Sequence, residues 1–223
     1  MFQTHAEQWA YETFSRANLG DSRRTKRLIK FTASLANHIG QSIVQSLKTP
    51  ADIEAAYRLT RNQAIDAAAI AEARFAATAE HAKSYDCLLA LEDTTSLEFT
   101  HRTVREEMGY TTSRKSDTGL HAHSVSLFAP SEDQVIGLIE QTRWTRALNH
   151  YGKKAQRASR PYKDKESYKW ERASQATEAR LGSEMNKVIS VCEIRYAPVT
   201  LKMPVNKRGE IGSTVLCELS GNE

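Results

Sequence analysis

The chain has 223 residues, 40% of them hydrophobic and 26% charged, which is typical of one or two globular domains. No window approaches the roughly eighteen consecutive apolar residues of a membrane-spanning helix, and the first residues lack the pattern of a secretory signal. Three cysteines without metal-ligand spacing favour a reducing compartment, so we expect a cytoplasmic protein without membrane association.

The first third of the sequence predicts a helical domain. Apolar residues recur at helical spacing within residues 6–17 and 22–40. Asp21 is placed to cap the second of these helices, and Thr49, which precedes a proline, to cap a third. An alanine-rich stretch predicts the last helix, so we expect a compact, all-helical domain over residues 1–84.

Cations crowd the start of the second predicted helix. They are Arg23, Arg24, Lys26, Arg27 and Lys30. Positive charges beside a helix N-terminus oppose the helix macrodipole, so the cluster costs stability unless an anionic partner offsets it. DNA phosphates would do so, and a solvated helix face is the alternative interpretation. We expect Arg58 and Arg61, near the end of the next helix, to add DNA contacts.

Beyond residue 84 the hydrophobic pattern changes from helical spacing to apolar runs and alternation. Strands are predicted over residues 87–93, 121–129, 134–144 and 186–193, a loop over 145–163, a helix over 164–181, and further β patterning over 194–203 and 213–219. Strands followed by a helix and another strand predict an α/β sheet with a crossover, so the fold class is α+β overall.

Positive charge gathers in one part of this second region. The net charge of the chain is +4, yet residues 141–180 hold eleven Lys or Arg against four acids. Such a stretch favours a polyanionic partner, with a solvated helix and loop as the equally weighted alternative. Trp144 and Trp170 flank the stretch, and we expect them to pack in the core rather than to stack on DNA bases. His121 and His123 share one strand face, where a structural role is favoured over metal binding.

Two acids, Glu92 and Asp93, directly follow the apolar run Leu88–Leu91. Acids are disfavoured in strands and rarely buried, so the pair predicts either a loop with a functional role or a solvated strand end. Successive strand residues face opposite ways, which places Asp93 on one side of the sheet and Glu92 on the other. For the hydroxyls of residues 94–96 we expect hydrogen bonds at a turn or strand end.

Five segments, taken in chain order, carry a family resemblance: WAYETFSRANLGDSRRTKRL, AAYRLTRN, LLALEDTTSLEF, HSVSL and NKVISVC. They resemble the bacterial cut-and-paste insertion-sequence transposases of the Tn-five type, which belong to the DDE class. The resemblance implies a helical N-terminal domain that recognises transposon ends and a ribonuclease-H-like core whose carboxylates hold divalent metal. It implies a catalytic and metal-binding role for Asp93, Mg²⁺ as cofactor, and double-stranded DNA of the transposon ends as partner.

The sequence departs from this family pattern after residue 192. Where the family has its second Asp, this chain has Glu193, and the residues that follow resemble a β-rich insertion found further along these transposases. We therefore expect a partial ribonuclease-H-like core over residues 85–193 and an insertion remnant over 194–223, as an internal deletion and a missing C-terminal part would leave. Glu193 either replaces the second catalytic Asp or marks the deletion junction.

The expected function is binding of transposon-end DNA by a transposase-like protein whose catalytic centre is incomplete. The family activity is metal-dependent phosphodiester hydrolysis followed by strand transfer, and we expect Mg²⁺ to bind weakly here. One alternative is an inhibitor of transposition that occupies the ends or pairs with a full-length transposase. The other is a gene remnant without function.

Overall fold

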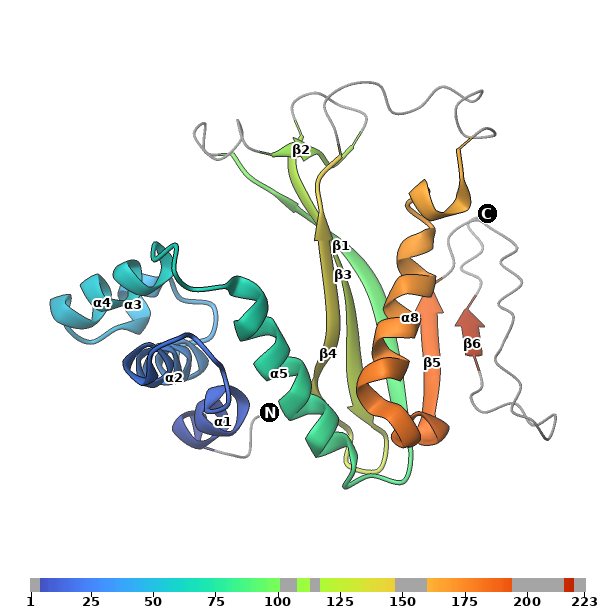
Figure 1. The fold of residues 1–223 in the computed structure, drawn as a ribbon, viewed down its shortest axis with the longest axis horizontal. Helices are drawn as coiled ribbons and strands as arrows, with labels where there is room; N and C mark the ends of the chain where they lie inside the picture. The colour runs from blue at the N-terminus through green and yellow to red at the C-terminus, as the bar shows by residue number, and fades with distance from the viewer. Residues whose placement is uncertain (1–4, 101–107, 113–116, 147–159, 194–214, 219–223) are drawn as a thin grey trace. The chain divides into compact units, whose positions relative to one another are not determined.

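The computed structural model describes residues 5–100, 108–112, 117–146, 160–193 and 215–218 (Figure 1). The chain divides into two compact units, Met1–His81 and Ala82–Glu223. Across the described residues, none of the helices combines the length and apolar character needed to span a membrane.

The first unit is built from helices. They are α1 (Ala6–Phe14), α2 (Ser22–Ala36), α3 (Ile43–Ser46), α4 (Pro50–Thr60) and α5 (Ala67–Ala82), the last reaching the boundary of the unit. The two predicted caps are confirmed: the Asp21 side chain accepts a hydrogen bond from the Arg23 backbone amide, and Thr49 accepts one from that of Asp52. These bonds satisfy amides that a helix start leaves unpaired.

The core of the first unit forms where α1, α2, α4 and α5 supply apolar side chains. Its buried members are Phe14, Ala17, Leu19, Leu28, Leu59 and Ala73. The prediction that α2 continues to Gly40 is wrong, because the helix ends at Ala36. Ile39 consequently leaves the apolar face and is 74% exposed. The short helix α3, which begins with a capping box between Ser42 and Gln45, was not predicted.

The second unit is a mixed sheet. Its strands are β1 (Leu88–Glu98), β2 (Gly109–Tyr110), β3 (Thr118–Ala129), β4 (Gln134–Trp144), β5 (Val188–Glu193) and β6 (Val215–Glu218). β3 pairs antiparallel with β1, β2 and β4, and β5 lies parallel to both β1 and β6. The order β2-β3-β1-β5-β6, with β4 also on β3, brings strands distant in the sequence together (Figure 1).

Helix α8 (Tyr168–Leu181) connects the antiparallel strands to β5 and packs against β3 and β4 (Figure 1). Ala173, Thr177 and Leu181 recur at a spacing of four residues and are buried, so they form the face of the helix that meets the sheet. The predicted helix end at Gly182 is confirmed. The predicted start at residue 164 is wrong, because a 3-10 turn, Tyr162–Asp164, precedes α8.

Strand β1 is longer than the sequence predicts. It was expected to end at Asp93, but it continues to Glu98 because β3 keeps pairing with it as far as Gly119. The two backbones approach so closely that a Cβ atom on Gly119 would lie 1.9 Å from the carbonyl oxygen of Leu97. Residues 94–96 are therefore part of the strand rather than a turn. Most of the predicted loop 145–163 and the predicted strand 194–203 lie outside the described residues.

Candidate DNA-binding and metal-binding sites

Four of the five predicted DNA-binding cations of α2 are exposed. Arg23, Arg27 and Lys30 follow the i, i+4, i+7 spacing, so they form one continuous basic face. Lys26, three residues after Arg23 and four before Lys30, borders this face and lines a pocket together with Ile29.

Several of these cations already hold carboxylates. The pairs are Arg23 with Asp21 at 2.9 Å, Lys30 with Asp52 at 2.5 Å and Arg58 with Glu54 at 2.8 Å. The Arg23 guanidinium holds the pKa of Asp21 below its usual value, and Lys30 does the same for Asp52. A phosphate that binds at these positions must therefore compete with carboxylates of the protein itself.

Arg24 has a visible structural role. Its Nη1 atom donates hydrogen bonds to the backbone carbonyl of Leu19, 2.9 Å away, and to that of Ala64, 3.2 Å away. The side chain is half-buried and links the start of α2 to the loop before α5. Sequence reasoning placed Arg24 among the DNA contacts because it could not identify these carbonyls, one of which lies forty residues away.

The remaining predicted DNA-binding cations are Lys26, Arg27 and Arg61. Within the described residues, neither Lys26 nor Arg27 makes a hydrogen bond or an ion pair. Arg61 lies over the ring of Tyr57, with its guanidinium carbon 5.2 Å from the ring centroid. Stacking of this kind leaves the N–H groups at the guanidinium edge available to donate hydrogen bonds to a phosphate or to a base edge.

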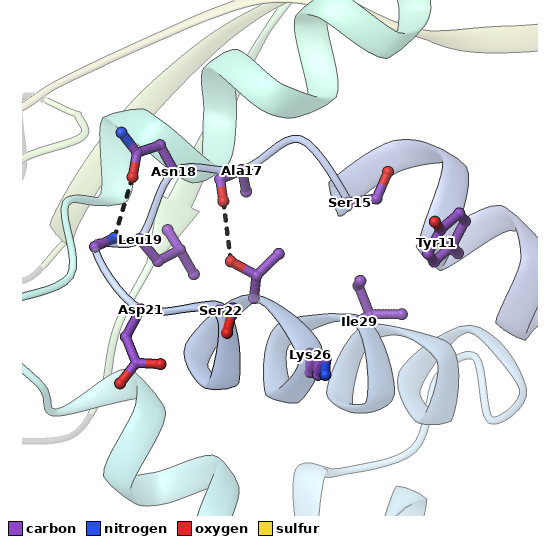
Figure 2. Close-up of a pocket in the computed structure, with 11 residues that line it drawn as sticks. Tyr11, Ser15, Ala17, Asn18, Leu19, Asp21, Ser22, Lys26 and Ile29 are labelled. Carbon is purple, nitrogen blue, oxygen red and sulfur yellow. Dashed lines mark hydrogen bonds between the residues drawn. The ribbon is translucent and has the colours of Figure 1, made fainter.

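An open pocket of about 420 Å³ lies between α1 and α2 (Figure 2). Its rim combines Tyr11, Ser15, Lys26 and Ile29 with the backbone of the turn between the helices. Two hydrogen bonds fix that turn: the Asn18 side chain accepts from the Gly20 amide, and the Thr25 hydroxyl donates to the Ala17 carbonyl. Gly20 has φ +75°, in the left-handed region that favours glycine.

In the second unit, Asp93 and Glu92 point to opposite faces of β1, as alternation requires. Glu92 is 8% exposed and belongs to the face that α8 covers, where its carboxylate lies 3.6 Å from the Nε2 atom of His123. Asp93 is exposed, and its carboxylate accepts a hydrogen bond from the hydroxyl of Thr95 at 3.2 Å. Asp93 is thus the acid of the two that can meet a ligand from solvent.

Strand register places Asp93 beside Glu193. The parallel pairing of β1 and β5 ends at Glu92 opposite Cys192, so the next residue of each strand takes the neighbouring position on the same face. Glu193 is in turn paired with Glu218 of β6. The side chains of both glutamates are outside the described part of the structure. Glu193 lies at the carboxyl end of β5, whereas Asp93 lies within β1, just past the point where the parallel pairing with β5 ends.

The donor chemistry at Asp93 fits a hard divalent cation. An exposed carboxylate offers oxygen ligands of the kind that Mg²⁺ prefers, with water completing the shell. Within the described residues, however, no three His, Cys, Asp or Glu side chains converge in a way that could hold a metal ion. His121 and His123, which share a strand face, are likewise not part of such a group.

Sequence reasoning missed the hydroxyl partners of two buried histidines of β3, His121 and His123. Hydrogen bonds join the hydroxyl of Thr94 to Nδ1 of His123, at 2.9 Å, and that of Ser96 to Nδ1 of His121, at 3.1 Å. Burial lowers the pKa of His121. The only available signal was the alternation of hydroxyls at positions 94 and 96 with histidines at 121 and 123.

The two tryptophans pack on these histidines. Trp144 stacks on His121 with ring centroids 5.3 Å apart, and Trp170 meets His123 edge-on at 4.5 Å. Lys169 lies over both indoles, with its Nζ atom 5.1 Å from the Trp144 centroid and 5.5 Å from that of Trp170. Packing rather than base stacking is therefore what the structure shows for both indoles.

The geometry of the first unit is that of a small helical domain with an exposed basic face, the kind of surface that binds nucleic acid. Residues 6–65 match the family model described as transposase DNA-binding. The match covers about a quarter of the chain, from the start of α1 to just before α5, and includes all seven predicted DNA-binding residues. The match supports a transposase-type DNA-binding domain over residues 6–65, with DNA as its partner.

Proposed function

We propose that this protein recognises the end sequences of a transposon through its first unit. The observation that carries the proposal is the exposed face formed by Arg23, Arg27 and Lys30 within the region that matches the transposase DNA-binding family. Phosphate contacts from such a face position a protein on the duplex, whereas contacts to base edges give sequence preference. Arg58 and Arg61 are the proposed further contacts, and the cytoplasm is the proposed compartment.

For the rest of the chain we propose a partial ribonuclease-H-like core over residues 85–193, followed by an insertion segment over 194–223, with the DNA-binding domain over 1–84. Support comes from the sheet, in which the antiparallel strands β1, β3 and β4 are followed by helix α8 and by β5, which is parallel to β1. The segment LLALEDTTSLEF, which carries the family resemblance, supplies the central strand β1 of this sheet.

In this core Asp93, with Glu193 at the neighbouring strand position, would hold Mg²⁺. A bound ion would supply charge stabilisation to a phosphodiester under attack. Asp93 contributes an exposed oxygen donor, and the hydroxyl of Thr95 orients it. Because no larger ligand set lies among the described residues, we expect one weakly bound ion and no cleavage of end DNA by this chain alone.

A binding domain joined to an incomplete catalytic centre also favours the second candidate function, inhibition of transposition. Such a chain would occupy transposon ends, or pair with a full-length transposase, without cutting. Labelled end DNA incubated with this chain and Mg²⁺ should remain uncut, and adding the chain to a full-length transposase should reduce its cutting. Nicking that persists in pure wild-type protein and disappears in Asp93→Ala would refute the incomplete centre.

Fluorescence anisotropy of the full chain tests end recognition, with the terminal repeats that flank the gene compared with scrambled duplexes of equal length. The double variant Arg23→Ala/Arg27→Ala should flatten the slope of log affinity against log salt by about 0.9 to 1.8, because each phosphate contact contributes about 0.9 and Arg23 is already paired with Asp21. Arg16→Ala changes an exposed arginine in the turn after α1 that is not among the predicted DNA contacts; it is the control and should bind as wild type does. Equal affinity for both duplexes would refute end recognition.

A further inference from the structure

One ion pair crosses between two helices of the DNA-binding domain. Nζ of Lys30, on α2, lies 2.5 Å from Oδ1 of Asp52, on α4. The Lys30 side chain is 68% exposed and the Asp52 side chain 24%. Lys30 belongs to the basic face with Arg23 and Arg27, and since Arg23 is likewise paired with Asp21, two of the three cations hold carboxylates of the protein before any DNA arrives.

The carboxylate of Asp52 is held in place by more than the ion pair. Its Oδ2 atom accepts a hydrogen bond from the hydroxyl of Thr49 at 3.0 Å, and the Thr49 hydroxyl oxygen accepts one from the Asp52 amide at 3.1 Å. Lys30 first, then Thr49, and at longer range Arg27, keep the pKa of Asp52 below its usual value. The acid is therefore a fixed negative charge at the start of α4, where the helix dipole also favours it.

From this geometry we infer that Asp52 restrains DNA binding: it lowers the affinity for DNA of any sequence because it occupies Lys30 and keeps a negative charge beside the basic face. The inference rests on the proposed DNA-binding function and adds to it. Binding to random DNA draws its free energy almost wholly from cation–phosphate contacts. Base contacts, which only the end sequence can make, are independent of Asp52. A charge that opposes the phosphates of every duplex equally therefore lowers the affinity for end and random DNA by the same factor and leaves the ratio of the two affinities unchanged.

A purely structural role predicts different behaviour. If the pair serves only to join α2 to α4, removing it lowers stability slightly, as exposed pairs do, and weakens DNA binding through misplacement of the helices. If Asp52 restrains binding, removing its charge strengthens binding to random DNA. The two roles therefore differ in the sign of the change in affinity.

The test uses Asp52→Asn in the full chain, because asparagine keeps an oxygen that can accept the hydrogen bond from the Thr49 hydroxyl. Asp66→Asn is the matched control: it makes the same change of net charge in the same unit, and its side chain can still accept the hydrogen bond from the Ala68 amide. Asp52→Glu preserves the charge. Each variant is titrated by anisotropy with random and end duplexes between about 50 and 200 mM salt, the range over which phosphate contacts change affinity strongly.

We expect Asp52→Asn to raise random-DNA affinity by roughly three- to tenfold and to steepen the salt slope by about 0.9, the value of one released cation. Affinity for end DNA should rise by a similar factor, so the ratio of the two affinities should stay the same. Asp66→Asn and Asp52→Glu should behave as wild type. With Lys30→Gln already in place, removing Asp52 should no longer steepen the slope.

Three outcomes would overturn the inference: unchanged affinity and slope in Asp52→Asn, weaker binding in Asp52→Asn, or an equal gain in Asp66→Asn. The first two leave the pair with a structural role, and the third assigns the gain to net charge alone. Failure of the proposed function is separate, because it is read from wild type, as equal affinity for end and random duplexes.

Discussion

Replacing Arg24 with methionine separates a structural role from a DNA contact. The change keeps the length of the side chain but removes both hydrogen bonds from Nη1, to the carbonyls of Leu19 and Ala64. Each bond from a charged donor is worth about 1.5–3 kcal/mol when buried. Arg24 is only half-buried, so we expect a loss of about 2 kcal/mol in the free energy of unfolding of the first unit.

The loss should be visible in thermal unfolding of the full chain followed by the helix signal at 222 nm. For a domain of this size, 1 kcal/mol shifts the midpoint by about 4–8 °C, so the helical transition should fall by about 8–16 °C. Arg16→Met is the control, because Arg16 is exposed in the same unit and makes no hydrogen bond within the described residues. Its midpoint should stay close to that of wild type.

The DNA readout completes the experiment. Below its unfolding transition, Arg24→Met should keep the wild-type dependence of affinity on salt, since a residue committed to backbone carbonyls adds no phosphate contact. If instead its midpoint matches the Arg16 control while the salt slope flattens by about 0.9, Arg24 holds a phosphate, and the structural assignment is wrong.

Two further predictions concern the second unit. Gly119→Ala should lower the free energy of unfolding of this unit by about 3 kcal/mol or more, because the new Cβ meets the Leu97 carbonyl oxygen. The control is Gly182→Ala, which is strained at φ +55° but has open space for a Cβ, and it should lower the free energy of unfolding by only about 1–2 kcal/mol. Equal denaturation midpoints for the two variants would contradict the clash at Gly119. Glu166 forms a two-point ion pair with Arg146, which lowers the pKa of Glu166. Wild type should therefore unfold at a higher temperature than Glu166→Gln, with the full difference present above pH about 4.3, the pKa of Glu in the unfolded chain. The difference should vanish as pH falls through the lowered pKa of Glu166 in the folded state. A difference that stays constant from pH 7 to 3 would exclude this linkage.

Local sequence determined the elements whose stabilising contacts are close in the chain. The caps at Asp21 and Thr49 join groups two or three residues apart, so their side chains and positions predict them. Strand β4 was predicted with the observed bounds, residues 134–144, because it combines an apolar run with an adjacent turn. The likeness to transposases also came from contiguous segments, and its N-terminal part agrees with the family match over residues 6–65.

Only the tertiary structure decided the features that depend on distant partners. β1 extends past Asp93 because β3 offers it hydrogen-bonding groups, which no local pattern reveals. Arg24 is tied to Ala64, and Lys30 is neutralised by Asp52, through contacts that arise when helices pack. From the sequence alone, each of these two side chains could be interpreted as a solvated cation or as a phosphate ligand. Its actual partner was fixed by the packing of apolar faces, which sets the positions of the helices and so determines which charges meet.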